Sequence, residues 1–406
     1  MDENVLIPHL FRTEYRKIIA VLCKVFGVEH LNIAEDIVSD TFLLAAETWG
    51  LKGLPNNPTA WLYKVSKNKA IDFLRNKNKI AGYEKLEVSG QEVILDYIDL
   101  SSKNITDSQL QMMFAICHPS ISIEAQIGLS LSVLCGFGVE EIAEAFLSNK
   151  ETIYKRLARA KEKLRQEHVA IEMPTESEIN NRLEAVLKTL YLLFSEGYYS
   201  SSQNTTLRKD FCLEAMRLNL MIVENASTNI PSANALLSLM CFHASRFNAR
   251  TNEQGALILY EQQDESLWSK ELIDKGVYYL NRASTGKKLT KYHLEAAIAY
   301  WHTQKNDSKE KWENILQLYN RLLQIEYSPL AALNRTYALA KANTVEEAIS
   351  EAEKLELKDN HFYYALLGEL YASIDKEKAF FNFKKAYSLA KSSSDKQTLQ
   401  NKMEIL

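Results

Sequence analysis

Residues that interrupt helices are scarce in this chain. Only 13 Gly and 7 Pro occur in 406 residues, and long stretches of Ala, Leu, Glu and Lys place apolar residues at helical spacing. No segment shows the alternating pattern and turn residues of strands joined in hairpins. The sequence therefore predicts an all-α fold. A hydrophobic content of 46% provides apolar material for roughly two to four compact domains.

The N-terminal residues lack the features of a signal peptide, and no apolar run reaches membrane-spanning length. We therefore expect a cytoplasmic protein that makes no membrane contact. The cysteines are odd in number and never form a metal-binding CxxC pair, so we expect reduced, mostly buried thiols, no metal site and no cofactor. They are Cys23, Cys117, Cys135, Cys212 and Cys241.

The net charge of −4 hides segments of opposite sign. Residues 28–50 hold five acidic residues and no Lys or Arg, whereas residues 60–82 hold six basic residues and one acidic residue. Residues 150–165 hold seven basic and two acidic residues. Local charge of this kind indicates binding surfaces better than the sum does, so the overall negative charge does not exclude nucleic acid as a partner.

Composition also indicates where one module ends and the next begins. Scattered acidic residues, several Ser and little helical period at 83–107 are typical of a linker. We predict a first module at 1–82, that linker at 83–107, a second module at 108–170, a second linker at 171–180 and a C-terminal helical region at 181–406.

The stretch from Gly138 to Arg165 has the pattern of a helix, a tight turn and a second helix. Ser148 and Glu151 predict a capping box at the start of the second helix. The polar surface of that helix could enter a major groove, although a solvated basic helix is the alternative explanation. Cap, turn and charge together favour DNA binding. The candidate DNA-binding residues are Lys150, Thr152, Tyr154, Lys155, Arg156, Arg159 and Lys163.

Basic and aromatic residues are interleaved in the earlier basic stretch, residues 57–79. Aromatic rings beside cations suit unpaired bases, because stacking adds to phosphate neutralisation. For Trp61 and Phe73 taken singly, a position in the core is the favoured interpretation. The basic face is the firmer indication of a partner.

Three segments in this order resemble an extracytoplasmic-function sigma factor of RNA polymerase. They are AEDIVSDTFLLAAETW (34–49), NPTAWLYKVSKNKAIDFLR (57–75) and EEIAEAFLSNKETIYKRLARAKEKLR (140–165). The resemblance departs from the family pattern at Glu151, where the family often has Gly.

The resemblance implies that core RNA polymerase and promoter DNA are the partners. It implies a sigma region 2 helical bundle in the first module and a sigma region 4 helix-turn-helix, which reads the −35 element, in the second. The acidic helix with Glu35, Asp36 and Asp40 would bind the polymerase clamp. The residues implied for the −10 element are Asn57, Trp61, Lys64, Asn68, Lys69, Asp72, Arg75 and Lys77.

The C-terminal half resembles the extension of a sigma-factor subgroup with tetratricopeptide-like repeats, through stretches such as LYLLFSEGYYSSS (190–202) and SPLAALNRTYALA (328–340). Independently, Leu333, Asn334 and Tyr337 recur 34 residues later as Leu367, Gly368 and Tyr371, which is the tetratricopeptide period. Such helix pairs either bind a protein partner on a concave surface or clamp the sigma modules. Both alternatives stay open.

No HExxH, GxSxG, phosphate-binding glycine loop or paired-carboxylate motif occurs, so we do not expect an enzyme.

The predicted function is a sigma factor that directs core RNA polymerase to promoters, with a C-terminal regulatory helical domain. A helix-turn-helix transcriptional regulator with a sensing helical domain is the alternative. It would bind duplex DNA alone, and the acidic helix argues against it. A repeat scaffold with incidental basic segments is less favoured still.

Overall fold

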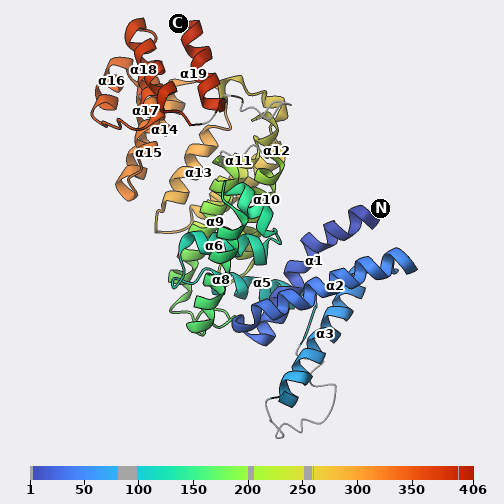
Figure 1. The fold of residues 1–406 in the computed structure, drawn as a ribbon. Helices are drawn as coiled ribbons and strands as arrows, with labels where there is room; N and C mark the ends of the chain where they lie inside the picture. Colours follow the sequence, from blue (N-terminus) through green and yellow to red (C-terminus); the bar gives the residue numbers. More distant parts are fainter. Residues whose placement is uncertain (1–2, 81–97, 200–204, 251–257, 259, 392) are drawn as a thin grey trace. The chain divides into compact units, whose positions relative to one another are not determined.

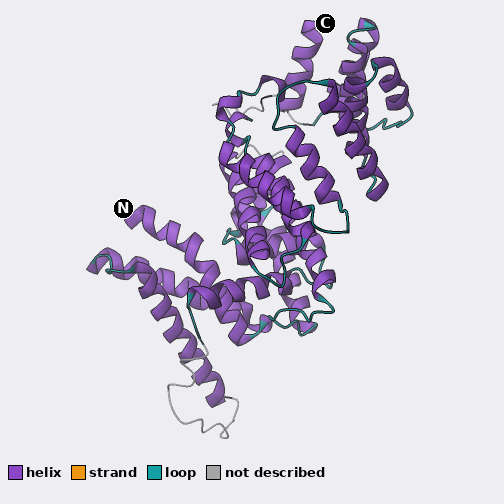
Figure 2. Cartoon of the chain, turned by 180° about the vertical axis from the view of Figure 1, so that it is seen from behind, coloured by secondary structure: helices purple, strands orange, loops and turns teal. Residues whose placement is uncertain are grey.

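A computed structural model of the chain describes residues 3–80, 98–199, 205–250, 258, 260–391 and 393–406. Every regular element in these ranges is a helix and none is a strand, which confirms the predicted all-α fold (Figure 2). The chain divides into two compact units, residues 1–228 and residues 229–406.

The first unit contains both predicted modules and two further helices (Figure 1). Its helix α5 begins inside the stretch that composition indicates as the first linker, and α9 begins inside the second predicted linker, at Ile179. The helices are α1 (Glu3–Phe26), η1 (Val28–His30), α2 (Leu31–Lys52), α3 (Pro58–Ile80), α5 (Ser102–Ile116), α6 (Ile123–Leu129), η2 (Ser130–Leu134), α7 (Val139–Ala145), α8 (Lys150–Gln166), α9 (Ile179–Tyr199) and α10 (Thr205–Glu224).

Helices α1, α2 and α3 pack against one another and form the N-terminal module. Apolar residues at helical spacing bury one face of each helix, including Leu22, Trp49 and Leu62. Polar contacts then fix the helices side by side. The Ser66 hydroxyl of α3 donates a 3.2 Å hydrogen bond to Thr41 of α2.

Helices α5 to α8, with the π-helical turn η2, form the middle module, and η2 also contacts α1. The chain leaves η2 through Gly136, whose φ of 77° lies in the left-handed region. A Cβ atom there would stand 3.3 Å from the backbone oxygen of Arg12. Glycine therefore permits both the turn and the close approach of the two modules.

Helices α9 and α10 complete the core of the first unit. The Thr189 hydroxyl of α9 donates to Gln126 of α6 at 2.8 Å, in a buried position. The ring of Phe211 on α10 packs edge-on against Phe137, with 4.7 Å between the centroids. Burying a large apolar side chain contributes about 2 kcal/mol, so the middle module depends on these two helices for much of its core.

The second unit consists of successive antiparallel helix pairs with their own buried clusters. Leu333 and Leu367, which are 34 residues apart, are both buried in one cluster. Gly368 lies against the ring of Phe383, so a side chain there would separate α17 from α18. The helices are α11 (Pro231–Ala244), η3 (Phe247–Ala249), η4 (Tyr260–Gln262), η5 (Glu265–Leu267), α12 (Lys270–Ala283), α13 (Lys291–Trp301), α14 (Lys309–Ile325), α15 (Pro329–Ala342), α16 (Val345–Glu353), α17 (His361–Tyr371), α18 (Lys376–Leu389) and α19 (Ser393–Ile405).

All five cysteines are free and buried, which confirms the prediction of buried reduced thiols. Burial raises the pKa of the Cys117 thiol to about 11, so it stays protonated at neutral pH. In the ranges that the structure describes, no group of three or more His, Cys, Asp and Glu could hold a metal ion. Within the same ranges, no helix has the length and apolar character needed to cross a bilayer.

We predict that a chain ending at Thr228 retains a stable first unit, whereas a chain ending at Val169 does not. The shorter chain lacks α9 and α10, which leaves apolar surface such as the ring of Phe137 exposed to water. Urea unfolding followed by circular dichroism measures the difference. Equal unfolding free energies for the two chains would show that α9 and α10 do not contribute to this core.

Candidate nucleic-acid and polymerase interface

Helix α8 has one apolar side and one charged side. Its inward residues are buried, as the sequence predicts, and they are Ile153, Leu157, Ala160 and Leu164. The seven candidate DNA-binding residues lie on the remaining surface, where all are exposed except the half-buried Arg156. Tyr154 has 65% of its surface exposed. The helix therefore presents a continuous polar surface while its apolar residues hold it in the module.

A four-residue turn, residues 146–149, joins α7 to α8. Leu147 adopts a left-handed conformation with φ of 47°, and the next backbone amide, of Ser148, donates back to Ala143 at 2.9 Å. The backbone then becomes extended at Asn149. This geometry fits the helix, turn and helix predicted for the segment.

The predicted capping box at the start of α8 is wrong by one residue. Asn149, not Ser148, is the N-cap, and its side-chain oxygen accepts a 2.7 Å hydrogen bond from the Thr152 amide. Because Ser148 continues the turn from α7, its side chain does not reach this position. Glu151 instead pairs with Lys155 one helical turn later, at 2.6 Å.

Carboxylates accompany several basic residues of α8. Lys150 pairs with Glu140, and Lys163 pairs with Glu167 at 2.6 Å. Hydrogen bonds from Arg165 and Gln166 lower the pKa of Glu162 to about 2, so that carboxylate stays ionised. Exposed pairs of this kind contribute little energy and exchange readily for other partners. The exposed cations of α8 thus remain accessible to other partners.

Helix α3 carries the second basic surface. Lys64 and Asn68 are exposed, and Lys69 forms a 3.5 Å ion pair with Asp40 of α2. Asp72 is exposed and lies 3.6 Å from Arg75. The side chain of Lys77 lies outside the described residues.

Two of the residues proposed for the same surface also have structural roles. The Asn57 side chain accepts a 2.9 Å hydrogen bond from the Ala60 amide and so caps α3. Trp61 is half-buried and packs edge-on against Trp49, with 5.4 Å between the centroids. The Trp61 ring thus contacts the core on one side and solvent on the other.

The acidic helix is α2, where Asp36 and Asp40 are exposed. Although residues 28–50 hold no Lys or Arg, Asp40 has a basic partner on the next helix, Lys69 of α3. Glu35 is different, because its carboxylate is held by Lys161 of α8 at 2.5 and 2.7 Å. Of the three candidate polymerase-binding acids on α2, two are therefore exposed and one binds another part of the chain.

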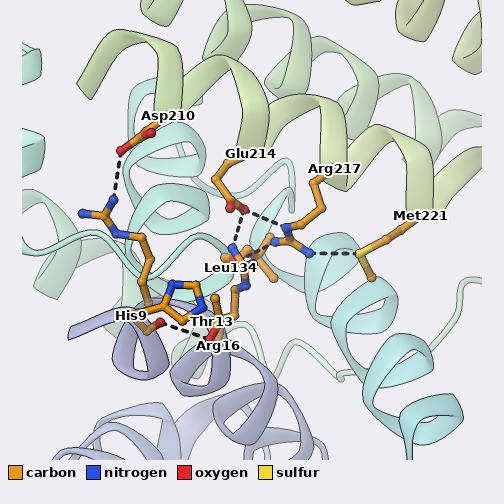
Figure 3. Close-up of polar contacts among 9 residues, drawn as sticks. His9, Thr13, Arg16, Leu134, Asp210, Glu214, Arg217 and Met221 are labelled. Atoms are coloured by element: carbon orange, nitrogen blue, oxygen red, sulfur yellow. Dashed lines mark hydrogen bonds and ion pairs between the residues drawn. The ribbon is translucent and has the colours of Figure 1, made fainter. Parts of the chain in front are cut away.

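Sequence reasoning missed a polar network between α1 and α10 (Figure 3). Arg16 of α1 forms a 2.5 Å ion pair with Glu214, which also pairs with Arg217 at 2.7 Å. Arg217 donates to the backbone oxygen of Leu134 at 2.8 Å. The partners are far apart in the chain, so periodicity and local charge give no indication of this network.

Comparison with known proteins agrees with this arrangement in the N-terminal module. Residues 10–80 match the family Sigma-70 region 2, which supports a sigma-factor role in transcription initiation with core RNA polymerase and promoter DNA as partners. Residues 182–284 match a family of unknown function (DUF6596). That match begins in the first unit and ends in the second.

An uncharacterized protein of Rhizobium meliloti (strain 1021) is similar to this chain along most of its length. It is 29% identical over 389 residues, which cover 93% of this chain and 90% of that protein. No solved structure matches the chain.

We predict that Asn149→Ala lowers the free energy of unfolding of the full chain by about 1 kcal/mol, the usual contribution of an N-cap. Ser148→Ala is the matched control. Its side chain does not cap α8, so its effect should stay within about 0.5 kcal/mol. Urea unfolding compares the two variants. A larger loss for Ser148→Ala would contradict the assignment of the cap.

Proposed function

We propose that this chain is a sigma factor of the extracytoplasmic-function type, which directs core RNA polymerase to particular promoters. The main support is the match of residues 10–80 to Sigma-70 region 2, where an acidic helix and a basic helix lie side by side. The chain itself performs no covalent chemistry in this role. It positions promoter DNA on the polymerase through charge and side-chain contacts.

In this proposal Asp36 and Asp40 on α2 bind a basic surface of core polymerase. Both are exposed, and complementary charge raises the rate and specificity of such an encounter. Glu35 joins them once it is released from Lys161.

The exposed Lys64 and the half-buried Lys69 and Arg75 of α3 bind the backbone of the opened −10 element. Lys64, Asn68, Lys69 and Arg75 supply phosphate and base contacts, and the half-exposed ring of Trp61 stacks on an unpaired base. Asn57 orders the start of α3. Asp72 holds the Arg75 side chain in position. We extend the basic surface to Lys77 on the basis of sequence alone.

The middle module reads the −35 element through α8 in the major groove. Thr152, Tyr154, Lys155 and Arg156 lie in the first turns, which usually contact base edges, and Lys150, Arg159 and Lys163 neutralise phosphates. Because α7 and the turn fix α8 by its buried face, the polar face stays directed outward.

For the C-terminal region we propose a regulatory helical domain with tetratricopeptide-like repeats. The 34-residue period and the helix pairs α15–α16 and α17–α18 support this assignment. Its surface mixes acidic and basic residues without a basic stripe, so a protein partner suits it better than nucleic acid.

We predict that Lys155→Ala and Arg156→Ala each weaken promoter binding by the polymerase complex by about 1 to 3 kcal/mol. Arg165→Ala is the control, since Arg165 lies on the same helix and pairs only with Glu162. Fluorescence anisotropy with labelled promoter DNA measures the affinity. If both variants give the same footprint on promoter DNA and the same affinity as Arg165→Ala, α8 does not bind the −35 element.

We predict that Asp36→Lys combined with Asp40→Lys lowers affinity for core polymerase at least about tenfold, because attraction becomes repulsion. Glu172→Lys with Glu176→Lys makes the same change in net charge at two other exposed positions. Sedimentation of the labelled chain with core polymerase gives the affinity. Circular dichroism should show an unchanged fold. Equal affinities for the two double variants would mean that the α2 acids do not face the polymerase.

A further inference from the structure

The second unit buries a lysine whose hydrogen bonds go to uncharged atoms. Lys311, in the first turn of α14, has only 2% of its surface exposed. Its ammonium donates to the backbone oxygen of Gln304 at 2.6 Å and to the hydroxyl of Tyr260 at 3.2 Å. In the part of the chain that the structure describes, no carboxylate forms an ion pair with it. Because a buried charge usually needs an opposite charge, this position suits an anionic partner.

The nearby carboxylate of Asp307 is engaged elsewhere. One of its oxygens accepts a hydrogen bond from the Trp312 indole, and the other lies 3.4 Å from the ammonium of Lys341. Asp307 therefore acts on Lys311 only through its longer-range field. That field does not replace an oxyanion in contact with the ammonium.

A second cation lies near the same aromatic ring. The guanidinium carbon of Arg246 lies 5.4 Å from the centre of the Tyr260 ring, and the Lys311 ammonium lies 5.3 Å from it. Burial, and then the charge of Arg246, hold the pKa of Lys311 below its usual value. An anion in contact with both cations would remove the repulsion between them.

Two buried polar atoms beside these cations lack a hydrogen-bond partner in the described structure. They are the indole nitrogen Nε1 of Trp268, which is a donor, and the amide oxygen Oε1 of Gln263, which is an acceptor. The side chains are 9% and 5% exposed. The Trp268 ring lies 6.2 Å from the Tyr260 ring, centre to centre. Since buried polar groups are nearly always paired, these atoms suit a ligand that both accepts and donates a hydrogen bond.

The local fold holds this cluster in place and leaves one side accessible. The short turns η4 and η5 carry Tyr260 and Gln263 between α11 and α12, and Lys305 of the loop before α14 donates to the backbone oxygen of Gln263 at 2.5 Å. Arg246 and Tyr260 are half-buried, so solvent reaches the cluster at their side. A small molecule can approach the two cations from there.

We propose that this cluster in the second unit binds a small organic acid. A carboxylate or phosphate group of the ligand contacts Arg246 and Lys311. The same group accepts a hydrogen bond from the Trp268 indole, and a hydroxyl or amino group of the ligand donates to Gln263. Charge-assisted hydrogen bonds of this kind are strong where little water competes. The inference is independent of promoter recognition, because all of these residues lie in the second unit.

A neighbouring histidine does not add a third charge to the site. The His302 ring packs edge-on against Tyr260, with 5.4 Å between the centroids. Burial, with the charges of Arg246 and Lys311, lowers the pKa of His302 to about 3. His302 is therefore neutral at neutral pH, and the positive charge at the site comes from the lysine and the arginine.

Nuclear magnetic resonance of the full chain tests the site with two probes. Inorganic phosphate and lactate each carry an oxyanion and a hydroxyl donor, and sodium chloride at equal ionic strength is the control. The indole N–H signal of Trp268, assigned with Trp268→Phe, should shift and saturate with at least one probe, at a Kd of roughly 1 mM or lower. A signal that neither probe shifts, or that chloride shifts equally, would overturn the proposal. The probe that binds distinguishes a phosphate site from a carboxylate site.

Matched variants test whether the buried lysine binds the probe. Lys311→Met keeps the length of the side chain and should weaken binding at least about tenfold by titration calorimetry. Lys309→Met is the control, because Lys309 is exposed on the same helix and pairs with Glu313 at 3.7 Å. Equal affinities for the two variants would overturn the proposal.

Two further variants decide the matter if circular dichroism shows that Lys311→Met does not fold. Arg246→Gln should weaken binding of the same probe at least about tenfold. Trp268→Phe keeps an aromatic ring but removes the N–H donor, so it should weaken binding by about fivefold. Wild-type affinity in both variants would overturn the proposal.

Discussion

Two arginines on α1 connect parts of the first unit that are far apart in sequence. Arg12 binds carboxylates of α7 and α10, and Arg16 binds a carboxylate of α10 with both side chains at most 16% exposed. Removing one partner of such a pair would leave a charge with little access to water, which costs several kcal/mol. The position of the middle module therefore depends on helices that follow it in the chain.

The ion pairs of the first unit fall into two groups, which differ in how far water reaches them. Most cations of α3 and α8 are exposed or lie in weak surface pairs, so they can exchange a carboxylate for a phosphate at little cost. The Lys161–Glu35 pair is different, because it lies between modules and is shielded from water. The exposed pairs thus leave those cations accessible, while the shielded pair holds α8 against α2.

The local features of the fold could be predicted from sequence. The apolar residues of α8, such as Ile153 and Leu157, follow from helical spacing, and the scarcity of Gly and Pro indicates the all-α fold. The cap at Asn149 was predicted one residue too early, because Ser and Asn cap helices about equally well and the backbone of the turn decides between them.

Contacts between distant residues could not be predicted in this way. Lys161 and Glu35 are 126 positions apart, and nothing in the local pattern distinguishes Lys161 from its neighbours on α8. Composition likewise suggests a linker before α9, yet α9 and α10 pack into the first unit. Such contacts depend on how whole helices pack against one another, and the periodicity of a single sequence does not reveal that packing.

The distance between the modules in solution tests this account most directly. Spin labels at Ala46→Cys on α2 and Ala158→Cys on α8 occupy exposed positions, and double electron–electron resonance measures their separation. In the free chain the separation should be roughly 45 Å or less. The distribution of distances should be narrow in the full chain, and it should broaden when Arg12 and Arg16 are both replaced by Ala, because these side chains hold α1 against α7 and α10. An equally narrow distribution in the double variant would contradict the account.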